Sequence, residues 1–74
     1  MEKIEIRIDG MMCTMCEAHI NDLIRNNFFV KHIKSNHKKG VCIIETPETI
    51  KDDDLINAFK MSGYQILEIY HSLQ

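Results

Sequence analysis

The strongest constraint on the fold is a change in hydrophobic period at Gly10. Residues 3–9 alternate strictly between isoleucines and charged side chains, which is typical of a strand with one buried face. Between residues 14 and 27 the apolar side chains recur at helical spacing instead. This stripe consists of Cys16, Ile20, Leu23, Ile24 and Phe28. We therefore expect a strand, a short loop and a helix at the start of the chain.

The patterns in the rest of the chain predict three more strands and a second helix. Residues 29–37 and 41–46 are expected to form a hairpin around the turn signal KKG. Residues 50–62 have a helical pattern, with three aspartates near its start, where the helix dipole favours negative charge. Gly63 fits the C-terminal cap of this helix. A last strand is expected over residues 64–70.

The predicted order of elements, β-α-β-β-α-β, indicates an α+β fold. This order is typical of the ferredoxin-like arrangement, in which two helices cover one face of a four-stranded antiparallel sheet. A length of 74 residues suits a single domain over residues 1–74. The chain has 45% apolar and 27% charged residues, as expected for a globular protein and not for a disordered one.

Charge and composition exclude several classes of function. The net charge of −2 argues against general binding to nucleic acid or to an anionic membrane surface. No apolar run approaches the roughly 18 residues of a membrane span, and the first ten residues lack the apolar core of a signal peptide. We therefore expect a cytoplasmic protein without direct membrane insertion. In that compartment an odd number of cysteines, three here, argues against a disulfide framework.

Two of the cysteines, Cys13 and Cys16, lie three residues apart where the predicted loop meets the predicted helix. Backbone N–H groups and the positive end of the helix dipole favour thiolate over thiol at such a position. Two thiolates can close on one soft cation, such as copper(I) or zinc, and they select it over hard ions such as magnesium or calcium. The pair is therefore a candidate metal site.

The pattern of a structural zinc site is missing from the sequence. Such a site normally has four protein ligands, supplied by a second C-x-x-C or by a closely spaced histidine pair. Cys42 stands alone, in phase with Ile44 on a predicted strand, which indicates a small core residue. Two sulfurs suit an ion of low coordination number, copper(I) above all, and leave it open to another protein's thiolates. We therefore expect a site that hands its ion over, and two chains could share one ion as a metal-bridged homodimer.

The motif GMMCTMC at residues 10–16 resembles the GMxCxxC motif of the heavy-metal-associated domain, found in copper chaperones and in N-terminal modules of soft-metal P-type ATPases. The later LINAFKMSGY, residues 55–64, is similar to the second helix and Gly-Tyr exit loop of that family, and the likeness covers about residues 4–69. The resemblance implies a ferredoxin-like fold and cytosolic metal binding by Cys13 and Cys16. It also implies delivery of the ion, by ligand exchange, to a soft-metal P-type ATPase or another metal-binding partner domain.

Three further residues are candidates for supporting roles around the ion. The resemblance implies that Met11 packs into the core beneath the loop. It also implies that Tyr64 lies beside the metal site, where its hydroxyl could reach a thiolate. His19 follows Cys16 by one helical turn, and helical side chains lean toward the N-terminus, so that its ring could approach the Cys16 sulfur.

The sequence favours a copper(I)-binding transfer protein that is not an enzyme, because it contains no base–nucleophile pair and no phosphate loop. A zinc, cadmium or mercury domain of the same fold is the main alternative. Zinc-type members of the family often have a carboxylate beside the first cysteine, where this chain has Met12. A thiol–disulfide oxidoreductase also uses C-x-x-C at a helix start, but the thioredoxin arrangement expects a proline facing the sulfurs. Pro47, the only proline, instead ends the predicted hairpin.

Overall fold

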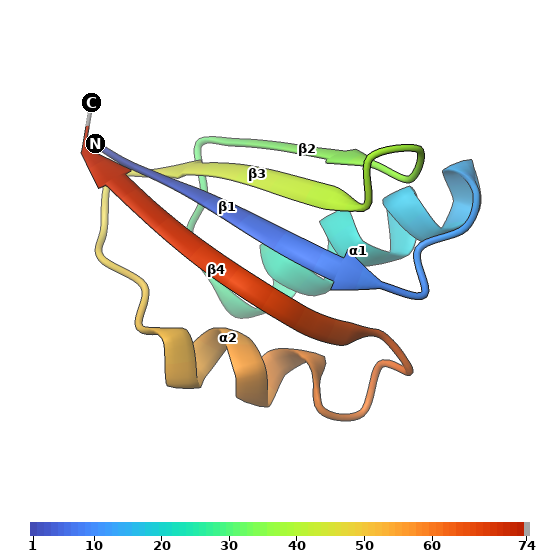
Figure 1. Ribbon diagram of the computed structural model, residues 1–74. Coiled ribbons are helices and arrows are strands. Elements are labelled where there is room, and N and C mark those ends of the chain that lie inside the picture. Colours follow the sequence, from blue (N-terminus) through green and yellow to red (C-terminus); the bar gives the residue numbers. More distant parts are fainter. Residues whose placement is uncertain (74) are drawn as a thin grey trace.

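The computed structural model describes residues 1–73 and has the predicted order of elements, β-α-β-β-α-β (Figure 1). The elements are β1 (Glu2–Asp9), α1 (Thr14–Asn27), β2 (His32–Asn36), β3 (Val41–Thr46), α2 (Asp52–Phe59) and β4 (Gln65–Leu73). The strands form one antiparallel sheet in the order β2-β3-β1-β4. The ferredoxin-like fold class expected from the sequence is therefore confirmed.

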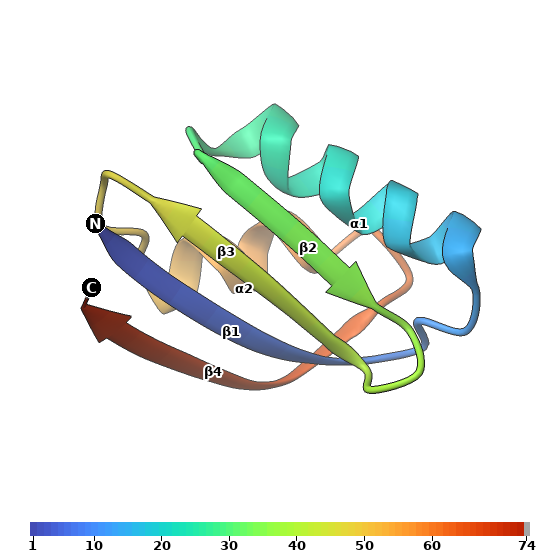
Figure 2. The same cartoon turned by 90° about the horizontal axis from the view of Figure 1, so that it is seen from above.

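Both helices cover the same face of the sheet (Figure 1 and Figure 2). The alternation in β1 directs its isoleucines toward the helices, and in the register between β1 and β3 Ile4 pairs with Ile44 and Ile6 with Cys42. One core lies between the sheet and the helices. It consists of Ile4, Ile6, Ile8, Met11, Ile20, Ile24, Cys42, Ile44, Ile50, Leu55 and Phe59.

The first helix has its predicted bounds, Thr14–Asn27. Two members of its apolar stripe, Ile20 and Ile24, are fully buried, and the other three pack against the core while remaining partly exposed. Removing one such side chain from water contributes roughly 1.5–3 kcal/mol. The stripe therefore fixes α1 on the sheet, and with it the loop that precedes the helix.

The second helix begins later than predicted, at Asp52 instead of residue 50. Lys51 has extended backbone (φ −78°, ψ 147°), so that the helix cannot include the residue before it. Ile50 is nevertheless buried, and its N–H donates to the carboxylate of Glu2 at 3.4 Å. Ile50 thus packs in the core from the segment before the helix. The apolar pattern in the sequence is the same as if Ile50 lay in the first helical turn.

The second helix also ends earlier than predicted, at Phe59. The hydroxyl of Ser62 donates to the carbonyl oxygen of Phe59 at 2.6 Å, and the Ser62 N–H reaches the same carbonyl at 3.1 Å. These bonds satisfy a carbonyl of the last turn, and the chain turns over residues 60–62. Gly63, which was predicted to cap the helix, lies beyond this turn with a φ of +86°.

Three of the strands differ from the prediction at their ends, and β1 begins one residue earlier, at Glu2. β2 starts only at His32, because Phe29 is exposed and its carbonyl accepts a hydrogen bond from the hydroxyl of Thr46 at 2.8 Å, outside the ladder. β4 continues to Leu73, past its predicted end, because it pairs with β1 from Asp9 to Glu2. The bounds of β3 are those predicted.

Three connections lie at one end of the molecule: the β1–α1 loop, the β2–β3 turn and the α2–β4 loop (Figure 1 and Figure 2). The start of β1 and the end of β4 lie together at the other end. Within residues 1–73 no helix is long and apolar enough to cross a membrane. The cysteine pair belongs to the first of these connections, so that the neighbouring turn and loop form its surroundings.

Candidate metal centre

The loop that carries the cysteines begins at a glycine with a left-handed backbone. Gly10 has a φ of +97°, which L side chains rarely adopt. A Cβ at this position would lie 3.6 Å from Cδ1 of Tyr64 and 3.8 Å from the carbonyl oxygen of Gly63. Backbone conformation, rather than lack of space, therefore requires glycine here, and the turn brings the loop against the α2–β4 connection.

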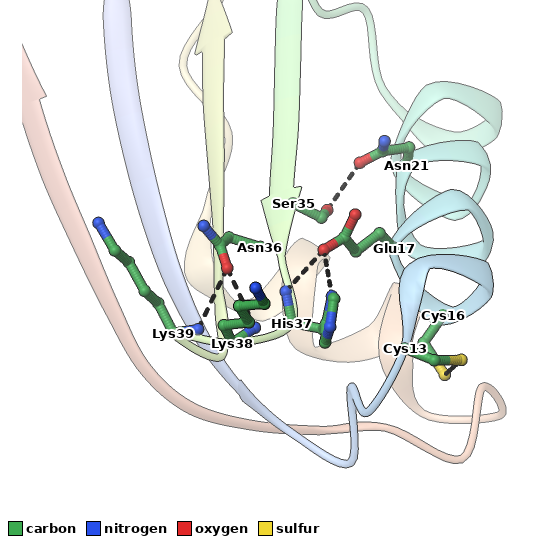
Figure 3. Close-up of polar contacts among 9 residues, drawn as sticks. All are labelled: Cys13, Cys16, Glu17, Asn21, Ser35, Asn36, His37, Lys38 and Lys39. Atoms are coloured by element: carbon green, nitrogen blue, oxygen red, sulfur yellow. Dashed lines mark hydrogen bonds and ion pairs between the residues drawn. The ribbon is translucent and has the colours of Figure 1, made fainter.

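Cys13 and Cys16 lie side by side where this loop becomes α1. Cys13 precedes the helix with extended backbone, and its carbonyl accepts the N–H of Glu17 at 3.2 Å. Its side chain makes no capping bond, and its Sγ lies 3.5 Å from the Sγ of Cys16 (Figure 3). Cys13 is exposed, Cys16 is half-buried, and both are free thiols. The sulfurs are therefore adjacent, reduced and open on one side.

This separation allows one ion to contact both sulfurs. A thiolate–zinc bond is about 2.3 Å long, so that two sulfurs 3.5 Å apart can lie in bonding distance of the same ion. A linear arrangement with bonds of that length would need a separation of about 4.6 Å, which is wider than the one observed. Among residues 1–73 no cluster of three or more histidine, cysteine or acidic side chains is arranged to hold a metal. The site thus offers two sulfur ligands.

The surroundings of Cys16 favour its thiolate. A hydrogen bond from the hydroxyl of Tyr64, then one from the backbone of Met12, then one from the side chain of Cys13 lower the pKa of Cys16 from 9.0 to about 7. The same contact raises the pKa of Tyr64 to about 12, because the phenol is the donor to the sulfur. The phenol of Tyr64 thus favours the thiolate form of Cys16.

Solved structures of metal-binding domains have the same architecture. The CopZ metallochaperone matches with a TM-score of 0.77 over 88% of this chain and 98% of its own, at 17% sequence identity. The N-terminal domain of ZntA in its Zn(II) form gives 0.76 over 89% of each chain at 15% identity. A copper binding domain from HMA7, a P-type ATPase, gives 0.72 over 93% of this chain and 97% of its own at 21% identity. The chain has the heavy-metal-associated fold.

By sequence, the chain is similar to parts of two mercuric reductases. It is 33% identical over 69 residues to the enzyme of Lysinibacillus sphaericus and 30% identical over 64 residues to that of Bacillus cereus. These regions make up 93% and 86% of the chain but only 12% and 10% of the reductases. The chain thus spans about a tenth of the length of these relatives. No family model matches the sequence.

The other residues singled out near the motif take different positions in this heavy-metal-associated fold. Met11 is only 5% exposed and belongs to the core, beneath the loop. Met12 and Met15 are 81% and 66% exposed beside the cysteines. His19 is exposed on α1. The methionine thioethers thus divide into one that supports the loop and two that face solvent.

Cys42 is a core residue of the heavy-metal-associated fold, away from the pair. Its side chain is fully buried, and burial raises the pKa of its thiol to about 11. Ser35, at the paired position on β2, is also buried, and its hydroxyl donates to Oδ1 of Asn21 at 2.7 Å. A polar residue on the inner side of β2 is therefore satisfied by a side chain of α1.

One contact beside the cysteine pair was not predicted from the sequence. The carboxylate of Glu17, the residue after Cys16, accepts the backbone N–H of His37 at 2.8 Å and contacts Nδ1 of the same histidine at 2.6 Å (Figure 3). These contacts with His37 lower the pKa of Glu17. They join α1 to the β2–β3 turn across 20 residues of sequence, a separation at which no periodic pattern could have indicated them.

Proposed function

We propose that residues 1–74 form a single heavy-metal-associated domain that binds one soft metal ion through Cys13 and Cys16 and passes it to a partner. Copper(I) is the ion we propose first. One observation carries the proposal: two sulfurs lie 3.5 Å apart at an open helix start. Within the described residues no cluster adds a third ligand. Two soft ligands select a thiophilic ion and leave it accessible.

The difference between the two cysteines supports an order of transfer. Cys13 is exposed, whereas Cys16 is half-buried and accepts the hydrogen bond of Tyr64. A thiolate of the partner first bonds to the ion, the bond from Cys13 then breaks, and the bond from Cys16 breaks last. Each sulfur leaves with the electron pair that it brought, so that the oxidation state of the ion is unchanged. The protein acts as a carrier, not as an enzyme.

The partner we propose is a soft-metal P-type ATPase or another metal-binding domain, because such a partner offers competing thiolates. The solved relatives support this kind of partner, since they include a metallochaperone and a domain of a P-type ATPase. The three cysteines are free thiols, which suits a reducing compartment. We therefore propose a cytoplasmic site of action.

Anaerobic titration with copper(I) against a competing chelator tests this proposal. The reduced protein is expected to take up one ion per chain, and replacing both Cys13 and Cys16 with serine is expected to abolish this binding. Cys42→Ala is the matched control, because it removes a buried thiol outside the pair and is expected to retain binding. Copper(I) is refuted as the cargo if the wild type binds none of it, and the cysteine pair is refuted as the site if the double serine variant binds as well as the wild type.

Mercury(II) is the second candidate ion, supported by the similarity of the chain to mercuric reductases over 93% and 86% of its length. Two thiolates also suit this ion. Competition between mercury(II) and copper(I), measured in the Cys42→Ala background so that only the pair binds, distinguishes the two cargoes. Retention of mercury(II) together with failure to bind copper(I) in the chelator assay would replace copper(I) as the cargo. It would leave the transfer role intact.

A further inference from the structure

The β2–β3 turn next to the cysteine loop is held by its own hydrogen bonds. Oδ1 of Asn36 accepts the backbone N–H groups of Lys38 and Lys39 at 3.0 and 3.2 Å (Figure 3). The N–H of Gly40 donates to the carbonyl of Asn36 at 2.9 Å, and the positive φ of Gly40, +68°, closes the turn. Residues 36–40 therefore form an ordered unit, which we call the brace turn.

The brace turn contacts both ends of the cysteine loop. On one side the carbonyl of Gly40 accepts the N–H of Ile8 at 2.8 Å, near the end of β1. On the other side His37 binds the carboxylate of Glu17 through its backbone N–H at 2.8 Å and through Nδ1 at 2.6 Å, in the first turns of α1. The segment between Ile8 and Glu17 contains both sulfurs. Its two ends are thus bonded to the same turn.

The contact made by Glu17 is well placed to position the sulfurs without touching the ion. Figure 3 shows its carboxylate pointing toward the brace turn, whereas Cys13 and Cys16 point away from it. The same oxygen of Glu17, Oε2, makes both contacts with His37. The side chains of Glu17 and His37 are about three-quarters buried, at 24% and 25% exposed. Because Glu17 directly follows Cys16, movement of its backbone would move the Cys16 sulfur.

We propose that the Glu17–His37 contact is a positioning element for the metal site: it holds the first turn of α1 so that Cys16 is ordered before the ion arrives. This inference rests on the proposed function. Supporting residues that bond directly to metal ligands typically contribute 10–100-fold to metal affinity. Glu17 acts through the backbone of its neighbour, so we expect the lower end of this range, a loss of about 10-fold.

The test compares Glu17→Ala with Asn21→Ala. Asn21 lies one helical turn further along α1 and also joins the helix to β2, through Ser35 at 2.7 Å, so the control breaks a similar contact away from the sulfurs. Copper(I) affinity is measured by chelator competition. Hydrogen exchange of the amides of residues 17–20, which bond to the carbonyls of residues 13–16 in an α-helix, is measured in the metal-free protein. We expect Glu17→Ala to bind about 10-fold more weakly and to exchange faster, and Asn21→Ala to bind within about twofold of wild type.

Two additional variants make the test sharper. His37→Ala added to Glu17→Ala is expected to cause no further loss of affinity, because the two residues act through one contact. If Glu17→Ala does not fold, Glu17→Gln replaces it; the amide oxygen can still accept the His37 N–H, and a loss of about threefold is expected from the weakened, uncharged bond.

Three results would overturn the inference. They are wild-type affinity in Glu17→Ala, equal losses in Glu17→Ala and Asn21→Ala, and a further loss of affinity when His37→Ala is added to Glu17→Ala. A wild-type protein that binds no copper(I) would instead contradict copper(I) as the cargo in the proposed function. In that event the exchange of residues 17–20 alone decides whether the contact orders the helix start, with faster exchange in Glu17→Ala supporting the ordering and unchanged exchange refuting it.

Discussion

Replacing Tyr64 with phenylalanine removes one hydroxyl from the metal site and leaves the ring in place. That hydroxyl is the largest of four hydrogen-bonding contributions that lower the pKa of Cys16 from 9.0 to about 7, against an opposing contribution from burial. Loss of the largest contribution is expected to return roughly half of the shift, to a pKa of about 8. At pH 7 the ionised fraction of Cys16 would fall from about one half to about one tenth.

The assay is the rate of alkylation of Cys16 by iodoacetamide as a function of pH, with the modified residue identified by mass spectrometry of peptides. Because only the thiolate reacts, Tyr64→Phe is expected to react about fivefold more slowly at pH 7. The midpoint of its rate profile should lie about one pH unit higher. Tyr70→Phe, at an exposed tyrosine on β4, is the control and should behave as wild type. An unchanged midpoint in Tyr64→Phe would refute the assignment of this hydroxyl to the sulfur.

Three further predictions concern stability, each measured by urea unfolding. Ile24→Ala removes a fully buried side chain and should cost about 2–5 kcal/mol; a loss below about 1 kcal/mol would contradict the described packing. Gly10→Ala forces a φ of +97° on alanine and should cost about 1–3 kcal/mol, so a neutral result would mean that the loop adopts another backbone. A hydrogen bond to the carboxylate of Asp52 and a smaller contribution from that of Glu2 raise the pKa of His71. The contribution of His71 to the free energy of unfolding should therefore be present below the ordinary pKa of a histidine and be lost as pH rises through the raised pKa. His71→Gln should remove this pH dependence. Parallel stability–pH profiles of the variant and the wild type would contradict the prediction.

The fold could be predicted because its determinants are local and periodic. Alternation over seven residues of β1 specifies which face is buried, and an apolar stripe along residues 16–28 specifies a helix. Such patterns depend only on neighbours in the chain, so they survive without any knowledge of partners. The cysteine pair is equally local, since three residues span less than one helical turn. Its adjacency could therefore be anticipated before the sulfurs were placed.

The ends of α2 and the Glu17–His37 contact could not be predicted, for different reasons. Ile50 is buried from a linker, and an apolar residue one turn before a helix looks the same in sequence whether or not it is helical. The carboxylate of Glu17 meets His37 across 20 residues. In the sequence, a glutamate at this helical position is as compatible with exposure to solvent as with a contact to another element. Polar contacts of this kind become visible only when the packing of α1 on the sheet is known.

The pairing of β1 with β4 brings Glu2 and Leu73 together, far from the cysteine loop (Figure 1). Any polypeptide joined to either end would therefore attach at the same end of the domain. The sulfurs would then lie at the opposite end of a domain 29 Å long. Rotation about the attachment point would therefore displace the sulfurs further than the attachment point itself. A domain attached in this way could thus present its sulfurs to partner proteins without obstruction by the attached polypeptide.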